Sequence, residues 1–498
     1  MNKLGLKLSL VLFAGSFIFY FTQCAKKEGF GPSKPAMIKG ITANNGGPLY
    51  CSISGGCPLS IVGENFADNA KVYVGPYPCS SQVINAEKTQ IDCVVGAGQN
   101  GVYDVNVKNG GVQSSTLDPS IVDPTTMQFS YASFLYIASQ ETPGRVYAYA
   151  QHPTTGALLT ITGSPFSIAG NNSSYGVIIH PNNRFLYAAN VASNTVSIYS
   201  ITPRTGALVQ VATPVASGSG GPNGLFFHPL GNFLYVSNYS GNTISAFAVA
   251  SDGTLTAIPG SPFAATGATT INGVVISSDG LFLYAASMGG NGGVVGYTIN
   301  QTTGSLTMIV GSPFRNTLGG DTANPGDGIT IHPNGHWLYM GLVNRRKVSA
   351  WTINSTTGEL TPIQPPTLNN STAGYADNGG SASTVSKDGR FLYGTAFSTI
   401  GTDPKKIIVY AIDQTTGGLT RSSETDTGGG PNDVRLDTNG LFAYTCNSLN
   451  PPSISAYSVN TSTGALTPLV PRDYGIAAPA SGPGIMVMQR NLTATPVE

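Results

Sequence analysis

Charged residues are scarce in this sequence of 498 residues. Asp, Glu, Lys and Arg make up only 10% of it, whereas they form about 25% of a typical globular domain. The 24 Lys and Arg residues balance the 24 Asp and Glu residues, so the formal net charge is zero. A protein that binds nucleic acid needs a basic excess to neutralise phosphates, so we expect no nucleic-acid partner.

Motifs that bind cofactors or metals are missing as well. The sequence has no Walker loop, no HExxH pair and no EF-hand loop, and it has no Gly-x-Ser-x-Gly at a strand-to-helix turn. It contains only five His residues. We therefore predict no cofactor and no metal site.

Glycine, proline and aromatic residues are plentiful instead. There are 63 Gly, 33 Pro, 20 Phe and 23 Tyr residues, and 41% of the chain is hydrophobic. Such a hydrophobic fraction excludes plain disorder. Many turn residues, many aromatics and few charges favour an all-β fold, and the length calls for more than one domain or a large repeat array.

The N-terminus has the pattern of an export signal. Lys3 and Lys7 precede the uncharged segment 8–21, which is too short for a comfortable membrane span. Cys24 follows, and the segment resembles the lipobox of bacterial lipoproteins, although Phe21 and Gln23 depart from the usual box. The resemblance implies a signal peptide at 1–23, lipidation of Cys24, a tether at 24–35 and a location at the bacterial cell envelope, in the outer membrane or at the cell surface. Ordinary cleavage beside an incidental Cys is the alternative.

Cysteine usage agrees with export. Cys51, Cys57, Cys79 and Cys93 cluster in one segment, which suggests two disulfides with three possible pairings. Short loops favour Cys51–Cys57 and Cys79–Cys93. Zinc is the competing interpretation, but the cluster has no CxxC pair and no nearby His. Cys446 stands alone in an apolar run, and we expect a buried free thiol there.

Residues 36–130 predict a small β-sandwich. Apolar and polar residues alternate in short runs between Gly and Asn turns, for example at 71–74 and 102–107. The order and spacing of Ile61-Val62-Gly63-Glu64-Asn65-Phe66, of the Tyr73 segment and of Thr89-Gln90-Ile91-Asp92-Cys93 resemble the IPT/TIG immunoglobulin-like domain. That resemblance implies a spacer or binding module, with Cys79 and Cys93 where extracellular members carry a cross-strand bridge.

Residues 131–490 contain seven similar repeats, followed by a tail at 491–498. A Phe-Leu-Tyr triplet or close variant recurs every 48 to 55 residues, starting at Phe134, Phe185, Phe233, Phe282, Trp337, Phe391 and Phe442. A Thr-Gly-x-Leu marker or a relative follows each one, with its glycine at Gly156, Gly206, Gly253, Gly304, Gly358, Gly417 and Gly464. Each repeat reads as four antiparallel strands, so the array predicts a seven-bladed β-propeller rather than a solenoid.

The ends of the array indicate how the ring closes. The first repeat begins at its second strand, and the C-terminal segment 482–488 supplies the missing first-strand pattern. We therefore predict that this last segment pairs with the strand around 134–138 and completes the first blade, which removes an unpaired edge.

The repeats resemble the seven-bladed lactonase family, which includes 6-phosphogluconolactonase, and the YVTN surface-layer propellers. The likeness lies in His180-Pro181-Asn182-Asn183-Arg184-Phe185-Leu186-Tyr187, in Thr205-Gly206-Ala207-Leu208 and in Tyr235-Val236-Ser237-Asn238. It implies the fold, with lactone hydrolysis as an associated activity. The His, Arg and Glu constellation of the catalytic members has no counterpart that can be placed here. The sequence therefore leaves enzymatic activity open and favours a protein that is not an enzyme, the alternative being a carboxylic-ester hydrolase that acts on lactones.

A polar channel mouth is the predicted site. His180, His228 and His332 each precede a Pro in a repeated turn, which indicates a structural role. The loops around the mouth supply Asp327, Asp433 and Arg435 as low-ranked catalytic candidates. They also supply five candidate ligand-binding amides, which are Asn190, Asn223, Asn238, Asn272 and Asn432. Loop geometry alone is the competing explanation for these residues.

Two functions remain open at this point. The first is a monomeric envelope lipoprotein, held in the membrane by its lipid, whose propeller binds a polar small molecule, a glycan or a protein. The alternative is a lactonase that hydrolyses a sugar-type lactone at the channel mouth with Asp327, Asp433 and Arg435.

Overall fold

The computed structural model describes residues 35–43, 50–52, 55–98, 101–109, 115–117, 128–168, 174–203, 205–218, 220–317, 326–342, 347–369, 382–396, 405–448, 451–476 and 483–489. The predicted signal peptide, Cys24 and nearly all of the tether lie outside these residues. Every helix or strand assigned within them is a β-strand, as the all-β prediction requires. No helix in the described part of the chain is long and apolar enough to cross a membrane.

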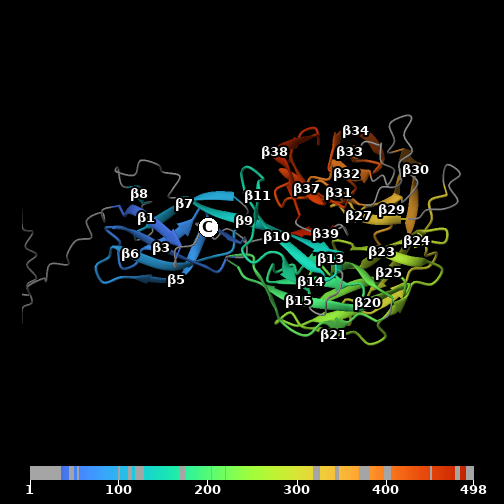
Figure 1. Cartoon of the computed structure of the whole chain (residues 1–498), viewed down its shortest axis with the longest axis horizontal. Coiled ribbons are helices and arrows are strands. Elements are labelled where there is room, and N and C mark those ends of the chain that lie inside the picture. The colour runs from blue at the N-terminus through green and yellow to red at the C-terminus, as the bar shows by residue number, and fades with distance from the viewer. Residues whose placement is uncertain are drawn as a thin grey trace, which may run out of the picture.

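The N-terminal domain is a two-layer β-sandwich (Figure 1). Its strands are β1 (Met37–Ala43), β2 (Tyr50–Ser52), β3 (Cys57–Glu64), β4 (Lys71–Val74), β5 (Tyr77–Ile84), β6 (Gln90–Val95), β7 (Gly101–Lys108) and β8 (Thr116–Leu117). Strands β1, β3, β6 and β5 form one layer, while β4 and β7 continue toward β9 (Gln128–Ser139). Alternate residues such as Leu59, Ile61 and Val72 are fully buried between the layers, as period-2 patterning predicts.

The cysteines of this domain only partly follow the prediction. Cys51 and Cys57 form a disulfide with their Cα atoms 6.0 Å apart. Cys79 and Cys93 are buried free thiols, so the predicted Cys79–Cys93 disulfide is wrong in this structure. In the ladder Cys79 lies opposite Val95 and diagonal to Cys93. The two thiols lie within hydrogen-bonding reach of each other but are not covalently joined.

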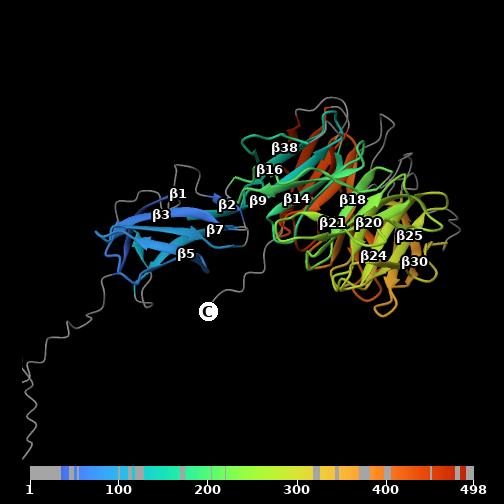
Figure 2. The ribbon, with the colours of Figure 1, turned by 90° about the horizontal axis from the view of Figure 1, so that it is seen from below.

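One long strand joins the two domains. The first half of β9 pairs with β7 and β2 of the sandwich, and its second half pairs with β10 (Arg145–Gln151) of the propeller. The strand runs across the predicted boundary after residue 130 without a break. Figures 1 and 2 show the sandwich and the propeller on either side of this strand.

The C-terminal domain is the predicted seven-bladed propeller. Its innermost strands are β39 (Pro483–Met488), β13 (Ser174–Ile179), β18 (Pro222–Phe227), β23 (Thr269–Ile276), β27 (Gly326–Ile331), β31 (Ser383–Val385) and β35 (Pro431–Leu436). In the same blade order the second strands are β9, β14 (Phe185–Asn190), β19 (Phe233–Asn238), β24 (Phe282–Gly289), β28 (Trp337–Leu342), β32 (Phe391–Ala396) and β36 (Phe442–Asn447).

The outer strands follow the same order, from blade 1 to blade 7. The third strands are β10, β15 (Thr195–Ile201), β20 (Thr243–Val249), β25 (Gly293–Ile299), β29 (Lys347–Ile353), β33 (Lys406–Ile412) and β37 (Ser453–Val459). The fourth are β11 (Leu158–Thr160), β16 (Leu208–Gln210), β21 (Leu255–Ala257), β26 (Leu306–Met308), β30 (Leu360–Asn369), β34 (Leu419–Asp426) and β38 (Leu466–Gly475). Short additional strands β12 (Phe166–Ser167), β17 (Val215–Ala216) and β22 (Phe263–Ala264) pair with the third strands of blades 1 to 3.

The C-terminal strand closes the ring as the sequence predicts. Strand β39 pairs antiparallel with β9, with Met488 opposite Leu135 and Met486 opposite Ile137. Blade 1 is therefore built from both ends of the propeller sequence, and β39 covers the edge of β9 that would otherwise be unpaired.

The two sequence markers of each repeat are the two halves of one contact between blades. In blade 3, the hydroxyl of Tyr235 donates to the carbonyl of Gly304 in the next blade at 2.8 Å. A Cβ added at Gly304, whose φ is +72°, would come within 2.6 Å of Phe233, so only glycine fits. Five other tyrosines repeat the hydrogen bond, which are Tyr136, Tyr187, Tyr284, Tyr339 and Tyr444. Because each contact needs both markers, they recur together.

Candidate functional site

A cavity of about 350 Å³ runs along the central channel of the propeller. The seven innermost strands line it, and its lining extends from Tyr175, Asn272 and Asp327 to Lys387 and Gly440 near the first turns of blades 6 and 7. Its volume lies within the usual range of small-molecule sites. The ring geometry therefore brings together residues from blades that are far apart in the sequence.

Neighbouring innermost strands approach closely around this channel. A Cβ added at Gly273 would lie 2.6 Å from the backbone oxygen of Asp327 in the next blade. Gly176 and Gly484 meet the carbonyl oxygens of Asn223 and Tyr175 in the same way. These glycines let the strands pack tightly enough to leave a narrow, partly desolvated space.

Asp327 is the carboxylate of this channel with the most strongly perturbed ionisation. Burial, and secondarily the charge of Asp433, raise its pKa from the ordinary 3.8 to about 7, although the Asn272 amide, which donates a hydrogen bond to the carboxylate, opposes the shift. At neutral pH the Asp327 carboxyl therefore exists in both protonation states. A group poised in this way can accept and return a proton.

Asp433 is held differently from Asp327. Its carboxylate accepts the Nε proton of Arg435 at 3.0 Å and the backbone N–H groups of Met486 at 3.0 Å and Val434 at 2.9 Å. Burial raises the pKa of Asp433, while the Arg435 charge and these hydrogen bonds lower it. Asp433 thus links blade 7 to the closing strand and fixes Arg435, rather than presenting a free carboxylate.

Arg435 keeps its terminal nitrogens available. Only its Nε makes hydrogen bonds within the described residues, to Asp433 and to the carbonyl of Met486 at 3.3 Å. The side chain is 38% exposed and lines the channel cavity. Its Nη groups can therefore donate to a ligand oxygen in the channel.

Sequence reasoning missed Tyr175 as a site residue. It lies at the start of β13 and lines the cavity. Burial and then the nearby Asp327 charge raise the pKa of its phenol well above the ordinary 10, so the hydroxyl stays protonated. The signal that could have found it is its position in the repeat. The residues that directly follow the last paired residue before the register shift of an innermost strand include Tyr175, Asn223, Asn272, Asp327 and Asn432.

The structure brings only some of the predicted amides to the channel. Asn272 and Asn432 line the cavity, and Asn223 is a buried neighbour of the lining. Asn190 and Asn238 are fully buried inside their blades and do not line the cavity. Their Nδ2 groups donate to hydroxyls of the third strand, to Thr195 and Ser197 for Asn190, and to Thr243 and Ser245 for Asn238.

The repeated histidines hold turns together, which is the structural role that the sequence indicated. His180 accepts the backbone N–H of Asn182 at Nδ1, and its Nε2 donates to the carbonyl of Gly231 in the next blade at 2.9 Å. His332 bridges to Gly389 in the same way at 2.7 Å. Within the described residues, no group of three or more His, Cys, Asp or Glu side chains could hold a metal ion.

Comparisons with known proteins agree with this architecture. A family model described as "Lactonase, 7-bladed beta-propeller" matches residues 89–220, 152–272, 177–367 and 322–479, and a model for the IPT/TIG domain matches 42–128. No curated protein sequence matches the chain.

Several solved structures share the fold at low sequence identity. Two candidate 6-phosphogluconolactonases, from Bacteroides uniformis and Bacteroides fragilis, are each 20% identical with a TM-score of 0.59. They cover 72% and 74% of this chain and 99% of their own. The periplasmic gluconolactonase of Pseudomonas aeruginosa is 19% identical with a TM-score of 0.59, covering 72% of this chain and all of its own.

Proposed function

Because the chain belongs to the lactonase family of seven-bladed β-propellers, we propose that it hydrolyses a lactone of the sugar-acid type in its central channel. The observation that carries this proposal is Asp327, a carboxyl in the channel lining whose pKa is raised to about 7. The lactonase names of the structural relatives support the same reaction class. The comparisons give no support to the scaffold role that the sequence alone favoured.

The proposed reaction uses Asp327 as the base. Its carboxylate accepts a proton from water, and the water oxygen forms a bond to the lactone carbonyl carbon. The Nη groups of Arg435 donate to the resulting oxyanion, which needs fixed donors in a site of low dielectric. When the tetrahedral intermediate collapses, the ring C–O bond breaks, and the ring oxygen takes the proton back from Asp327. The product is an open-chain hydroxy acid.

The charges of the channel favour an uncharged substrate. Asp327, Asp433 and Asp437 line the cavity, against the cations Arg435 and Lys387. Arg435 is already paired with Asp433, so the lining offers no cluster of free cations that could bind the phosphate of a phosphate ester. We therefore propose a neutral lactone such as glucono-δ-lactone over its 6-phospho derivative.

Purified protein tests the proposal with both lactones, corrected for spontaneous hydrolysis. We expect turnover of glucono-δ-lactone whose rate rises with pH up to about pH 7, as Asp327 ionises. Asp327→Asn should lower kcat by about 100-fold or more, whereas Glu359→Gln, an exposed side chain of the same propeller, should not. Absence of turnover on both lactones, or full activity of Asp327→Asn, would refute the proposal.

Anchoring in the cell envelope is a separate proposal that rests on the sequence. The uncharged segment 8–21 ahead of Cys24 supports processing at Cys24 and lipidation of its thiol and amine. Labelling with radioactive palmitate tests it. Cys24→Ser should abolish labelling, and unchanged labelling would exclude this anchor.

A further inference from the structure

A second cavity of about 340 Å³ lies between blades 6 and 7. Its lining includes Ser386, Lys387, Asp388, Phe391, Tyr393 and Val459. Lys387 and Gly440 also line the central channel, so the two cavities adjoin. None of the proposed catalytic residues belongs to this second lining.

Part of this cavity arises from a short side chain in the turn between the first and second strands of blade 6. In blades 2 and 5 the corresponding turns carry His180 and His332, and each imidazole reaches the turn of the next blade. Blade 6 carries Ser386 at this place. Its hydroxyl instead donates to Asp388 at 2.6 Å and accepts the backbone N–H of Phe391 at 2.9 Å. The short side chain leaves the volume of an imidazole unfilled beside Gly440.

Tyr393 is one of the residues that line the same cavity, and its hydroxyl is buried. It is the tyrosine of the blade 6 Phe-Leu-Tyr triplet and is fully buried. Its hydroxyl has no hydrogen-bond partner among the described residues, whereas the equivalent tyrosine in each of the other six blades donates to a glycine carbonyl. Phe391 still packs against Gly464 in the usual way. A buried hydroxyl without a partner carries a free-energy cost that a ligand acceptor would relieve.

Serine in the turn is not sufficient by itself to produce this arrangement. Blade 4 also carries a serine, Ser277, at the equivalent place. In that blade Tyr284 keeps its hydrogen bond to Gly358 at 2.8 Å. Blade 6 therefore differs from blade 4 by its free tyrosine hydroxyl.

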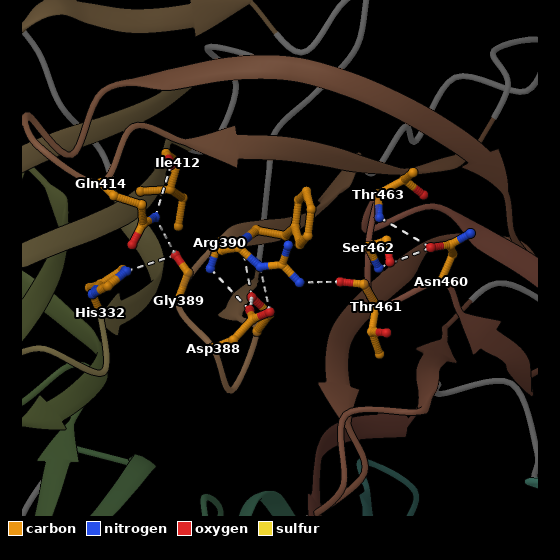
Figure 3. A network of polar contacts seen from close by, with 12 residues as sticks. His332, Asp388, Gly389, Arg390, Ile412, Gln414, Asn460, Thr461, Ser462 and Thr463 are labelled. Atoms are coloured by element: carbon orange, nitrogen blue, oxygen red, sulfur yellow. Dashed lines mark hydrogen bonds and ion pairs between the residues drawn. The ribbon is translucent and has the colours of Figure 1, made fainter.

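The charges around the cavity favour an anion. Figure 3 shows Arg390 reaching from blade 6 to Asp388 and to the carbonyl of Thr461 in blade 7. The ion pair of Arg390 with Asp388, at 2.7 Å, cancels both charges locally. Lys387 has no ion pair within the described residues, so the rim carries one uncompensated positive charge.

From these features we propose that the cavity between blades 6 and 7 binds a small, largely apolar monocarboxylate. Its hydrocarbon part would lie against Phe391 and Val459, its carboxylate would pair with Lys387, and one oxygen would accept the Tyr393 hydroxyl proton. This binding site is independent of the proposed lactone hydrolysis. A lone water molecule could also accept from Tyr393, but it would give no preference for an apolar anion.

Ligand-observed NMR with the full chain tests the proposal. The probes are sodium benzoate and sodium hexanoate, each compared with its neutral amide, benzamide or hexanamide. We expect saturable binding of at least one carboxylate and at least tenfold weaker binding of its amide. Absence of saturable binding by both carboxylates, or equal binding of acid and amide, would overturn the proposal.

Three variants locate the binding. Ser386→His restores the imidazole that blades 2 and 5 already accommodate, so it should fold and should abolish binding by filling the cavity. Tyr393→Phe should weaken binding about fivefold, and Lys387→Gln should remove the preference for the carboxylate. Tyr235→Phe, the equivalent change in blade 3, should leave binding unchanged. Binding that persists in Ser386→His would place the ligand elsewhere and overturn the proposal.

Discussion

Replacing Asp327 by Asn should make the propeller more stable at neutral pH. Asn occupies the equivalent position in blades 3, 4 and 7, as Asn223, Asn272 and Asn432, so the variant should fold. The wild-type carboxyl has its pKa raised from 3.8 to about 7 on folding, which means that the native state binds the proton more tightly than the unfolded state. Stability of the wild type therefore falls as pH rises through this window.

The size of the effect follows from the two pKa values. Raising a carboxyl pKa from 3.8 to about 7 corresponds to roughly 4 kcal/mol of lost stability above pH 7. Asp327 is partly open to the channel, and solvent screening reduces this to about 2–4 kcal/mol. The loss accumulates between about pH 4 and pH 7 and is constant above, because both states are then ionised.

Urea unfolding followed by tryptophan fluorescence measures this directly. The two Trp residues of the chain, Trp337 and Trp351, lie in blade 5 together with Asp327. The stability advantage of Asp327→Asn over the wild type should grow from pH 5 to pH 7 and then level off, while Glu359→Gln should show no such trend. An advantage that is the same at every pH would show that Asp327 ionises normally and would refute the reasoning.

Further predictions test the contacts between blades and the ring closure. Tyr235→Phe should lower the free energy of unfolding by about 1–2 kcal/mol, because it leaves a buried glycine carbonyl unpaired. Tyr393→Phe should lower it by less than about 0.5 kcal/mol, since the Tyr393 hydroxyl has no partner among the described residues. Urea unfolding compares the two variants, and equal losses of stability would contradict the distinction. Asp433→Ala should destabilise by about 2–3 kcal/mol, because Arg435 and the Met486 N–H lose their shared acceptor. A change within about 0.5 kcal/mol in the same assay would show that this link does not hold the closing strand.

The architecture could be predicted because its signals are local and repeated. The Phe-Leu-Tyr triplet and the Thr-Gly marker recur in every blade, and at six of the seven boundaries the tyrosine hydroxyl donates to the glycine carbonyl of the next blade, as Tyr235 does to Gly304. The closing strand could be predicted because segment 482–488 carries the sequence pattern of a first strand, although it follows the last repeat. The short loop between Cys51 and Cys57, which are six positions apart, favours their disulfide.

The composition of the site was only partly predictable. Asn190 and Asn272 look alike in the sequence, but one hydrogen-bonds within its blade and the other lines the channel. The innermost strands carry a register shift near their starts, as between Pro222 and Leu225, and such a shift changes which face a residue occupies. No local pattern records where that shift falls.

By itself, the sequence determined an all-β chain with a sandwich and seven blades closed by its last strand, because strand periodicity, turn residues and paired markers are properties of neighbouring residues. Only the tertiary structure decided which side chains share a space. The pKa of Asp327 depends on burial and on Asp433 two blades away, and the hydroxyl of Tyr393 lacks, among the described residues, the partner in the next blade that its six equivalents have. Such quantities arise from packing between segments distant in the chain, which the order of residues does not specify.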